Sequence, residues 1–119
     1  MSILTTLLTI FVALEFFYIM YLETFATDSK ATGRVFKMDK KELERPSVSL
    51  LFKNQGIYNG LLGIGLLYGL FFSVASLEII RGLLVYIILV ALYGSITTDK
   101  KIIFTQGGLA ILALISSFV

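Results

Sequence analysis

The chain has 119 residues, of which 57% are hydrophobic, with a mean hydropathy of +0.91 and a formal net charge of +2. A soluble domain of this size could not bury so much apolar surface, because small domains leave a large share of their surface in water. The chain contains no Cys, which excludes disulfides and thiolate chemistry, and no His, which removes the usual imidazole base and the commonest zinc ligand. We therefore expect a single-domain integral membrane protein with no metal site and no cofactor.

Four stretches are long and apolar enough to cross a bilayer as helices, which takes about 20 residues each. They cover residues 3–22, 55–75, 79–97 and 102–119. The first stretch differs from a signal peptide in three ways: it contains Glu15, no basic residue precedes the stretch, and no small-residue cleavage site follows it. We therefore interpret this stretch as a retained helix. The strict alternation of a membrane β-barrel is not seen. The sequence thus predicts an all-α fold, a bundle of four transmembrane helices.

The basic residues are distributed very unevenly between the connections. Nine of the ten lie either in the polar loop 24–54 or between the third and fourth stretches, and the tenth is Arg81. Because four crossings place these two connections on the same face, the positive-inside rule predicts that they are cytoplasmic and that both termini lie outside the cell membrane. Within the loop, the mixed charges of residues 39–45 suggest a short interfacial helix ended by Pro46. The loop is either a connector held near anionic lipid headgroups or a lid over a cytoplasm-facing pocket.

Hydrogen-bonding side chains are concentrated in the cytoplasmic halves of the four stretches. Glu15 lies about 12 Å from the cytoplasmic end of the first one, and Tyr18 follows on the same face. A carboxyl group within a hydrocarbon span is costly and normally faces the bundle interior, where it has a partner. The other candidate ligand-binding residues are Gln55, Tyr58 and Asn59 in the second stretch, Tyr93 in the third and Gln106 in the fourth. This asymmetry predicts a site around Glu15, with Asn59 and Gln55 as its nearest partners.

Purely structural interpretations exist for most of these residues. Asn, Gln and Tyr side chains often only link helices, and Tyr93 and Lys101 are placed like ordinary anchors at the membrane interface. Glu23, near the end of the first helix, fits a position at headgroup level. Gly56-x-x-x-Gly60 and Gly65-x-x-x-Gly69 fit the small-residue pattern of close helix packing.

Several short strings together resemble the DUF1304 family of small bacterial membrane proteins. They are Ala13-Leu14-Glu15-x-x-Tyr18 continuing to Glu23, then Gly33-Arg34, Asn54-Gln55-Gly56-x-Tyr58-Asn59-Gly60, Tyr93-Gly94, Lys101 and Gln106-Gly107. The resemblance covers nearly the whole chain and implies a four-helix membrane protein, but no activity. It adds Arg34 as a possible charge partner of Glu15 or Glu23, or of an anionic headgroup. Lys101, at the start of the fourth stretch, is a further possible charge partner. Family members often have His directly after the first Glu, whereas this chain has Phe16, so a role that needs imidazole there is not expected.

Three kinds of function remain open from the sequence. The first is binding or transport of a small amphiphilic or cationic ligand in a cytoplasm-facing pocket built around Glu15, in a homo-oligomer because four helices are few for a transporter. The second is a membrane enzyme on a lipid-like substrate, with Glu15 as general acid or base. The third is an accessory protein that binds a partner's helices, which leaves Glu15 unexplained. Membrane lipids are expected partners in each case, and nucleic acid is not.

Overall fold

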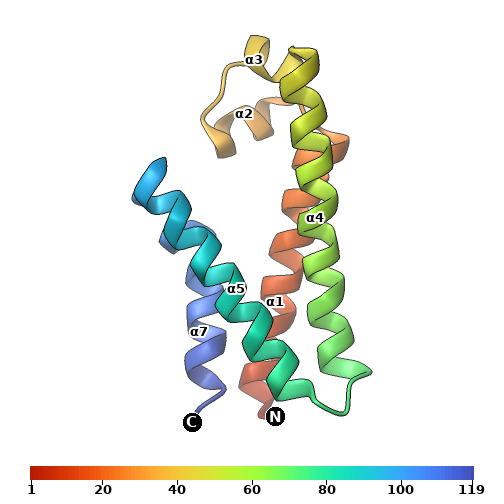
Figure 1. The fold of residues 1–119 in the computed structure, drawn as a ribbon, viewed down its shortest axis with the longest axis vertical. Helices are drawn as coiled ribbons and strands as arrows, with labels where there is room; N and C mark the ends of the chain where they lie inside the picture. Colours follow the sequence, from red (N-terminus) through yellow and green to blue (C-terminus); the bar gives the residue numbers. More distant parts are fainter. The chain divides into compact units, whose positions relative to one another are not determined.

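The structure is a computed structural model that describes residues 1–119, and its regular elements are all helices (Figure 1). This confirms the all-α fold class. In chain order the elements are α1 (Ile3–Met20), the π-helix η1 (Tyr21–Phe25), α2 (Lys30–Phe36), α3 (Lys40–Glu44), α4 (Pro46–Phe71), α5 (Ser76–Thr97), α6 (Ile102–Thr105) and α7 (Gly108–Ser116). The chain divides into two compact units, residues 14–63 and residues 1–13 with 64–119.

Two helical segments are long and apolar enough to cross a membrane. They are Ile3–Phe25, which joins α1 to η1 over 23 residues, and Ser76–Thr97, which is α5 with 22 residues. They correspond to the first and third of the four predicted stretches. Large apolar side chains are exposed on all the longer helices, among them Phe11, Tyr68, Leu89 and Ile115.

The other two stretches differ from the sequence prediction in their helix bounds. α4 begins at Pro46, nine residues before the predicted start at residue 55. Proline is well suited to the first position of a helix because its missing N–H would have no partner there. Residues 102–119 do not form one continuous helix, because α6 ends at Thr105 and α7 begins at Gly108. The two glycines at this break, Gly107 and Gly108, have low helix propensity.

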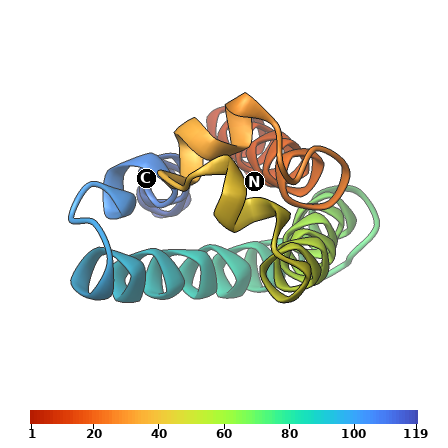
Figure 2. The ribbon, with the colours of Figure 1, turned by 90° about the horizontal axis from the view of Figure 1, so that it is seen from above.

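Unit 14–63 contains the end of α1, η1, the two short helices and the first two-thirds of α4. α2 and α3 lie at the end of the unit where η1 ends and α4 begins (Figures 1 and 2). A short helix was predicted within residues 39–45, and α3 occupies Lys40–Glu44, with Arg45 in an extended conformation before Pro46, as residues before proline prefer. The fully buried Leu43 of α3 anchors this helix in the unit.

The unit formed by residues 1–13 and 64–119 contains the start of α1, the end of α4, α5, α6 and α7. Thr5 and Ser116 are hydrogen-bonded through their hydroxyl groups at 2.9 Å, which links α1 to the end of α7. From α5, the Arg81 guanidinium donates to Ser117 Oγ at 3.0 Å and to the Ser117 backbone oxygen, and it lies 3.9 Å from the centre of the Phe118 ring. Arg81 therefore satisfies a carbonyl that the C-terminal end of α7 leaves free.

Candidate functional site

The strongest cluster of buried polar groups in unit 14–63 is centred on Glu23 in η1. Glu23 is only 5% exposed. Its Oε1 atom accepts a hydrogen bond from Asn59 Nδ2 of α4 at 2.5 Å. No Lys or Arg forms an ion pair with this carboxyl group in the chain, so the amide of Asn59 is its one side-chain partner.

The local backbone around Glu23 is a π-helical turn. The Ala26 N–H donates to the Tyr21 oxygen at 3.0 Å, five residues back, instead of the four of an α-helix. Single π turns of this kind are rare and occur frequently at functional sites. The Thr27 hydroxyl donates to the Glu23 backbone oxygen at 2.7 Å and so stabilises the turn from its C-terminal side.

Thr32 of α2 closes the C-terminal end of η1. Its side chain is fully buried. Its hydroxyl donates a hydrogen bond to the Ala26 oxygen at 2.6 Å and lies 3.1 Å from the Leu22 oxygen. Carbonyl groups at a helix end have no partner within the helix, and this hydroxyl supplies one. The return of the chain into α2 is therefore part of the structure that positions Glu23.

Two glycines allow α4 to approach the first helix closely. A Cβ atom on Gly56 would lie 2.0 Å from Thr24 Oγ1 and 3.1 Å from Glu23 Cβ, and one on Gly60 would lie 2.3 Å from Met20 Sδ. The interpretation of Gly56-x-x-x-Gly60 as a close-packing pattern fits these contacts. Both glycines therefore serve packing between helices within the chain.

Glu15 lies in α1 and is partly buried. Its Oε1 atom is buried and has no hydrogen-bond partner. The predicted pairing of Glu15 with Asn59 is replaced by the pairing of Asn59 with Glu23. The antiparallel contacts of Gly56 with Thr24 and of Gly60 with Met20 explain this difference, since they bring Asn59 level with Glu23, which is about 12 Å along the helix from Glu15.

The remaining predicted residues of this unit lie on its surface. Tyr18 and Tyr58 are 53% and 69% exposed, and Gln55 is exposed as well. Arg34 is exposed in α2 and forms no ion pair with Glu15 or Glu23. Of the residues predicted in this unit, the structure thus brings together Glu23 and Asn59.

Three predicted residues belong to the other unit. Tyr93 is exposed near the end of α5, and Lys101 is exposed directly before α6. Gln106 is partly buried at the break between α6 and α7. The Ser95 hydroxyl accepts the Ile103 N–H at 2.6 Å, so the start of α6 is held against the end of α5.

A cavity of about 620 Å³ is lined by Thr24 and Phe25, which directly follow Glu23 in the chain, but not by Glu23 itself. Its walls come from the end of η1 and the turn that follows it, from α3 and from the start of α4. They comprise Thr24, Phe25, Thr27, Asp28, Leu43, Glu44, Ser49 and Lys53. The sequence did not reveal this cavity, because its walls come from three short segments that only the tertiary fold brings together.

The pattern of the family described as "Protein of unknown function (DUF1304)" matches residues 10–118, which include every residue of the cluster. The chain belongs to the DUF1304 family. It is also similar to the "Uncharacterized protein YpaA" of Lactococcus lactis subsp. lactis (strain IL1403), with 75% identity over 118 residues that cover 99% of each chain. No solved structure matches this DUF1304 protein.

Proposed function

We propose that this DUF1304 protein is a multi-pass protein of the cell membrane that binds a small cationic or amphiphilic molecule. Glu15 and Glu23 are the acidic groups of the proposed site, which faces the cytoplasm. Asn59 orients the Glu23 carboxyl group, and Tyr18, Gln55 and Tyr58 are candidates for further contacts to the ligand.

One observation carries this proposal: two acidic side chains on one apolar helical segment have no basic partner in the chain. Glu15 Oε1 is buried without any hydrogen bond, and Glu23 is bonded only to an amide. Ionisable groups within membrane segments normally pair with one another or with a group of opposite charge, and they mark substrate or ion pathways. A positively charged or hydrogen-bond-donating ligand supplies the partner that the protein lacks.

The membrane placement is supported by hydropathy, exposure and charge. Two segments have the length and composition of membrane spans, and α4 has 26 residues, which at about 1.5 Å per residue exceeds the roughly 30 Å thickness of a hydrocarbon core. In the proposed topology, the crossings are α1 with η1, α4, α5, and α6 with α7. The fourth crossing is an interrupted helix, which membrane proteins tolerate where the free backbone groups are buried in protein or line a cavity. Nine of the ten basic residues then lie on the cytoplasmic side.

The proposed ligand has a cationic head and an apolar body. The two carboxyl groups favour positive charge, while the surrounding helix surfaces are apolar. A molecule of this kind reaches the site from the inner leaflet or from the cytoplasm. The cavity that begins at Thr24 provides space on the cytoplasmic side of Glu23, and α3 forms one of its walls, as the lid interpretation of the loop requires.

Binding of tetraphenylphosphonium, a lipophilic cation, to the purified full-length protein tests the proposal. Glu15→Gln and Glu23→Gln keep the size of the side chain but remove its charge, and each should weaken binding about tenfold or more, as expected for a lost charge-assisted contact. Glu78→Gln is the matched control, because Glu78 is exposed at the start of α5. Equal dissociation constants for the wild type and both test variants would refute the proposed site.

A further inference from the structure

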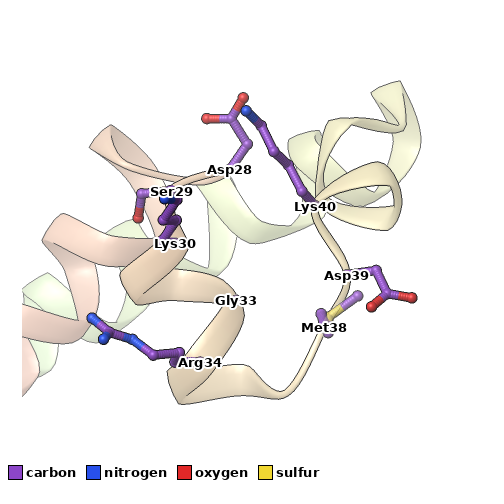
Figure 3. Close-up of a pocket in the computed structure, with 8 residues that line it drawn as sticks. All are labelled: Asp28, Ser29, Lys30, Gly33, Arg34, Met38, Asp39 and Lys40. Carbon is purple, nitrogen blue, oxygen red and sulfur yellow. The ribbon is translucent and has the colours of Figure 1, made fainter.

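A second cavity, of about 660 Å³, lies between α2 and α3 (Figure 3). It does not involve Glu15, Glu23 or Asn59. Its lining is Asp28, Ser29, Lys30, Gly33, Arg34, Met38, Asp39 and Lys40. Three cationic residues, Lys30, Arg34 and Lys40, and two acidic ones, Asp28 and Asp39, therefore line one hollow in a loop that connects two apolar helices.

The backbone of this cavity is fixed by specific interactions at both ends of α2. At the start, Ser29 Oγ accepts the Thr32 N–H at 3.2 Å, which is the usual cap of a helix N-terminus. At the end, Lys37 adopts a left-handed conformation with φ 54°, and the Gly33 oxygen accepts the N–H groups of Lys37 and Met38. A Cβ atom on Gly33 would lie 2.9 Å from the Met38 oxygen, so this tight return of the chain requires glycine.

The positive charge in this cavity is only partly compensated. Figure 3 shows the side chains of Asp28 and Lys40 reaching toward one another, and Lys40 also lies 3.9 Å from Glu44. Lys30 and Arg34 lie one helical turn apart on α2 and form no ion pair. Like charges at this spacing repel one another, so an anion bound between them would relieve an unfavourable contact.

We propose that this cavity binds the phosphate group of an anionic phospholipid, with Lys30 and Arg34 as its principal contacts. The Arg34 guanidinium offers paired donors that match phosphate oxygens, while Lys30 adds a second positive charge. Val35, next to Arg34, is 52% exposed, and Leu50 and Leu51 at the start of α4 are also exposed, which suits a segment at the boundary between headgroups and acyl chains. The inference rests on the proposed membrane placement but not on the cation site.

The source of the phosphate is assigned to a lipid and not to a soluble metabolite. The cavity is carried by the loop 24–54, which holds seven of the ten basic residues of the chain. Clusters of Lys and Arg next to a membrane helix on its cytoplasmic side are typical of binding to anionic lipids. Bound in this way, the lipid would hold α2 and α3 at the membrane surface.

Native mass spectrometry tests this assignment on full-length protein released from bilayers that contain equal amounts of phosphatidylglycerol and phosphatidylcholine. The wild type should retain phosphatidylglycerol preferentially. Lys30→Gln combined with Arg34→Gln should lower the relative affinity about tenfold or more, because each substitution removes a charge-assisted contact to the phosphate. The control combines Lys41→Gln with Lys100→Gln, which removes the same charge at exposed positions outside the cavity and should behave like the wild type.

Three outcomes would overturn the assignment. Equal phosphatidylglycerol retention by the test and control variants would show that the cavity is not the binding site. Equal retention of the two lipids by the wild type would show that the protein has no site selective for anionic lipid. Displacement of the lipid by an equal concentration of glycerol phosphate would show that the ligand is a soluble phosphate. Circular dichroism checks that the test variant is folded. Glu23→Gln separates this inference from the cation site, because this variant should lose tetraphenylphosphonium binding but keep phosphatidylglycerol.

Discussion

Asn59 in α4 donates a hydrogen bond to the Glu23 carboxyl group in η1, with 2.5 Å between Nδ2 and Oε1. The two residues are 36 positions apart in the chain. Gly56 and Gly60 let the backbone of α4 approach the first helix closely. In this close contact, the bond between Asn59 and Glu23 fixes the rotation of each helix about its axis. The orientation of the acidic group therefore depends on an amide in another helix.

Replacement of Asn59 by Ala should destabilise the protein and loosen the contact between η1 and α4. The change leaves a buried carboxyl group without its donor, which costs about 1 to 3 kcal/mol in proteins generally and about 0.6 to 2 kcal/mol in membrane helix pairs. Thermal unfolding in detergent measures this loss. Asn54→Ala is the control, since the Asn54 side chain is exposed and bonds only to the Leu50 oxygen of its own helix, and it should change the free energy of unfolding by less than about 0.5 kcal/mol. Equal stability of the two variants would contradict a structural role for the bond.

Replacement of Gly56 by Ala should separate α4 from η1. The added methyl group would lie 2.0 Å from Thr24 Oγ1, and relieving such an overlap typically costs about 1 to 3 kcal/mol. Gly82→Ala provides a matched control in α5, because a Cβ atom there has no neighbour within 4 Å, so the higher helix propensity of Ala should leave stability unchanged or raise it by about 0.5 to 1 kcal/mol. Unfolding curves of the two variants that shift in the same direction would argue against the close helix contact.

The sequence predicted those features of the fold that depend on local composition. The apolar runs located α1 and α5 to within a few residues, and the spacing of Gly56 and Gly60 predicted a close helix contact. Composition also identified Asn59 as a member of the polar cluster. These predictions succeeded because hydropathy and small-residue spacing act over one or two helical turns.

The partner of Asn59 could not be predicted, because it depends on the register between two helices. With the helix starting at residue 55, Asn59 was expected to be a partner of Glu15. The helix in fact begins at Pro46, and its glycines lie against Met20 and Thr24. No residue pattern marks the π turn that buries Glu23. The helix α2 was also missed, since its 7 residues are too few to show an apolar period, and the Ser29 cap and the tight turn at Gly33 become evident only with the backbone.

The absence of Cys allows a direct test of the proposed topology. Single cysteines introduced at Ser2, Val74 and Val119 should react with a membrane-impermeant maleimide added to intact cells, whereas a cysteine at Ser47 in the loop should react only after the membrane is opened. Val74 and Val119 are fully exposed, so their reactivity reports on the side of the membrane and not on burial in the protein. Labelling of the Ser47 position in intact cells, with protection of the other three, would reverse the proposed orientation.

The most direct test of the central claim is the reaction of the glutamates with dicyclohexylcarbodiimide, an apolar reagent that modifies carboxyl groups in membranes. Peptide mass spectrometry identifies the modified residues, with and without tetraphenylphosphonium. We expect modification of Glu15, whose carboxyl group lacks a partner, and protection of Glu15 by the cation, whereas the exposed Glu78 should show no protection. Reaction at Glu15 that is unaffected by a saturating concentration of the cation, or no reaction there at all, would contradict a cation site at this carboxyl group.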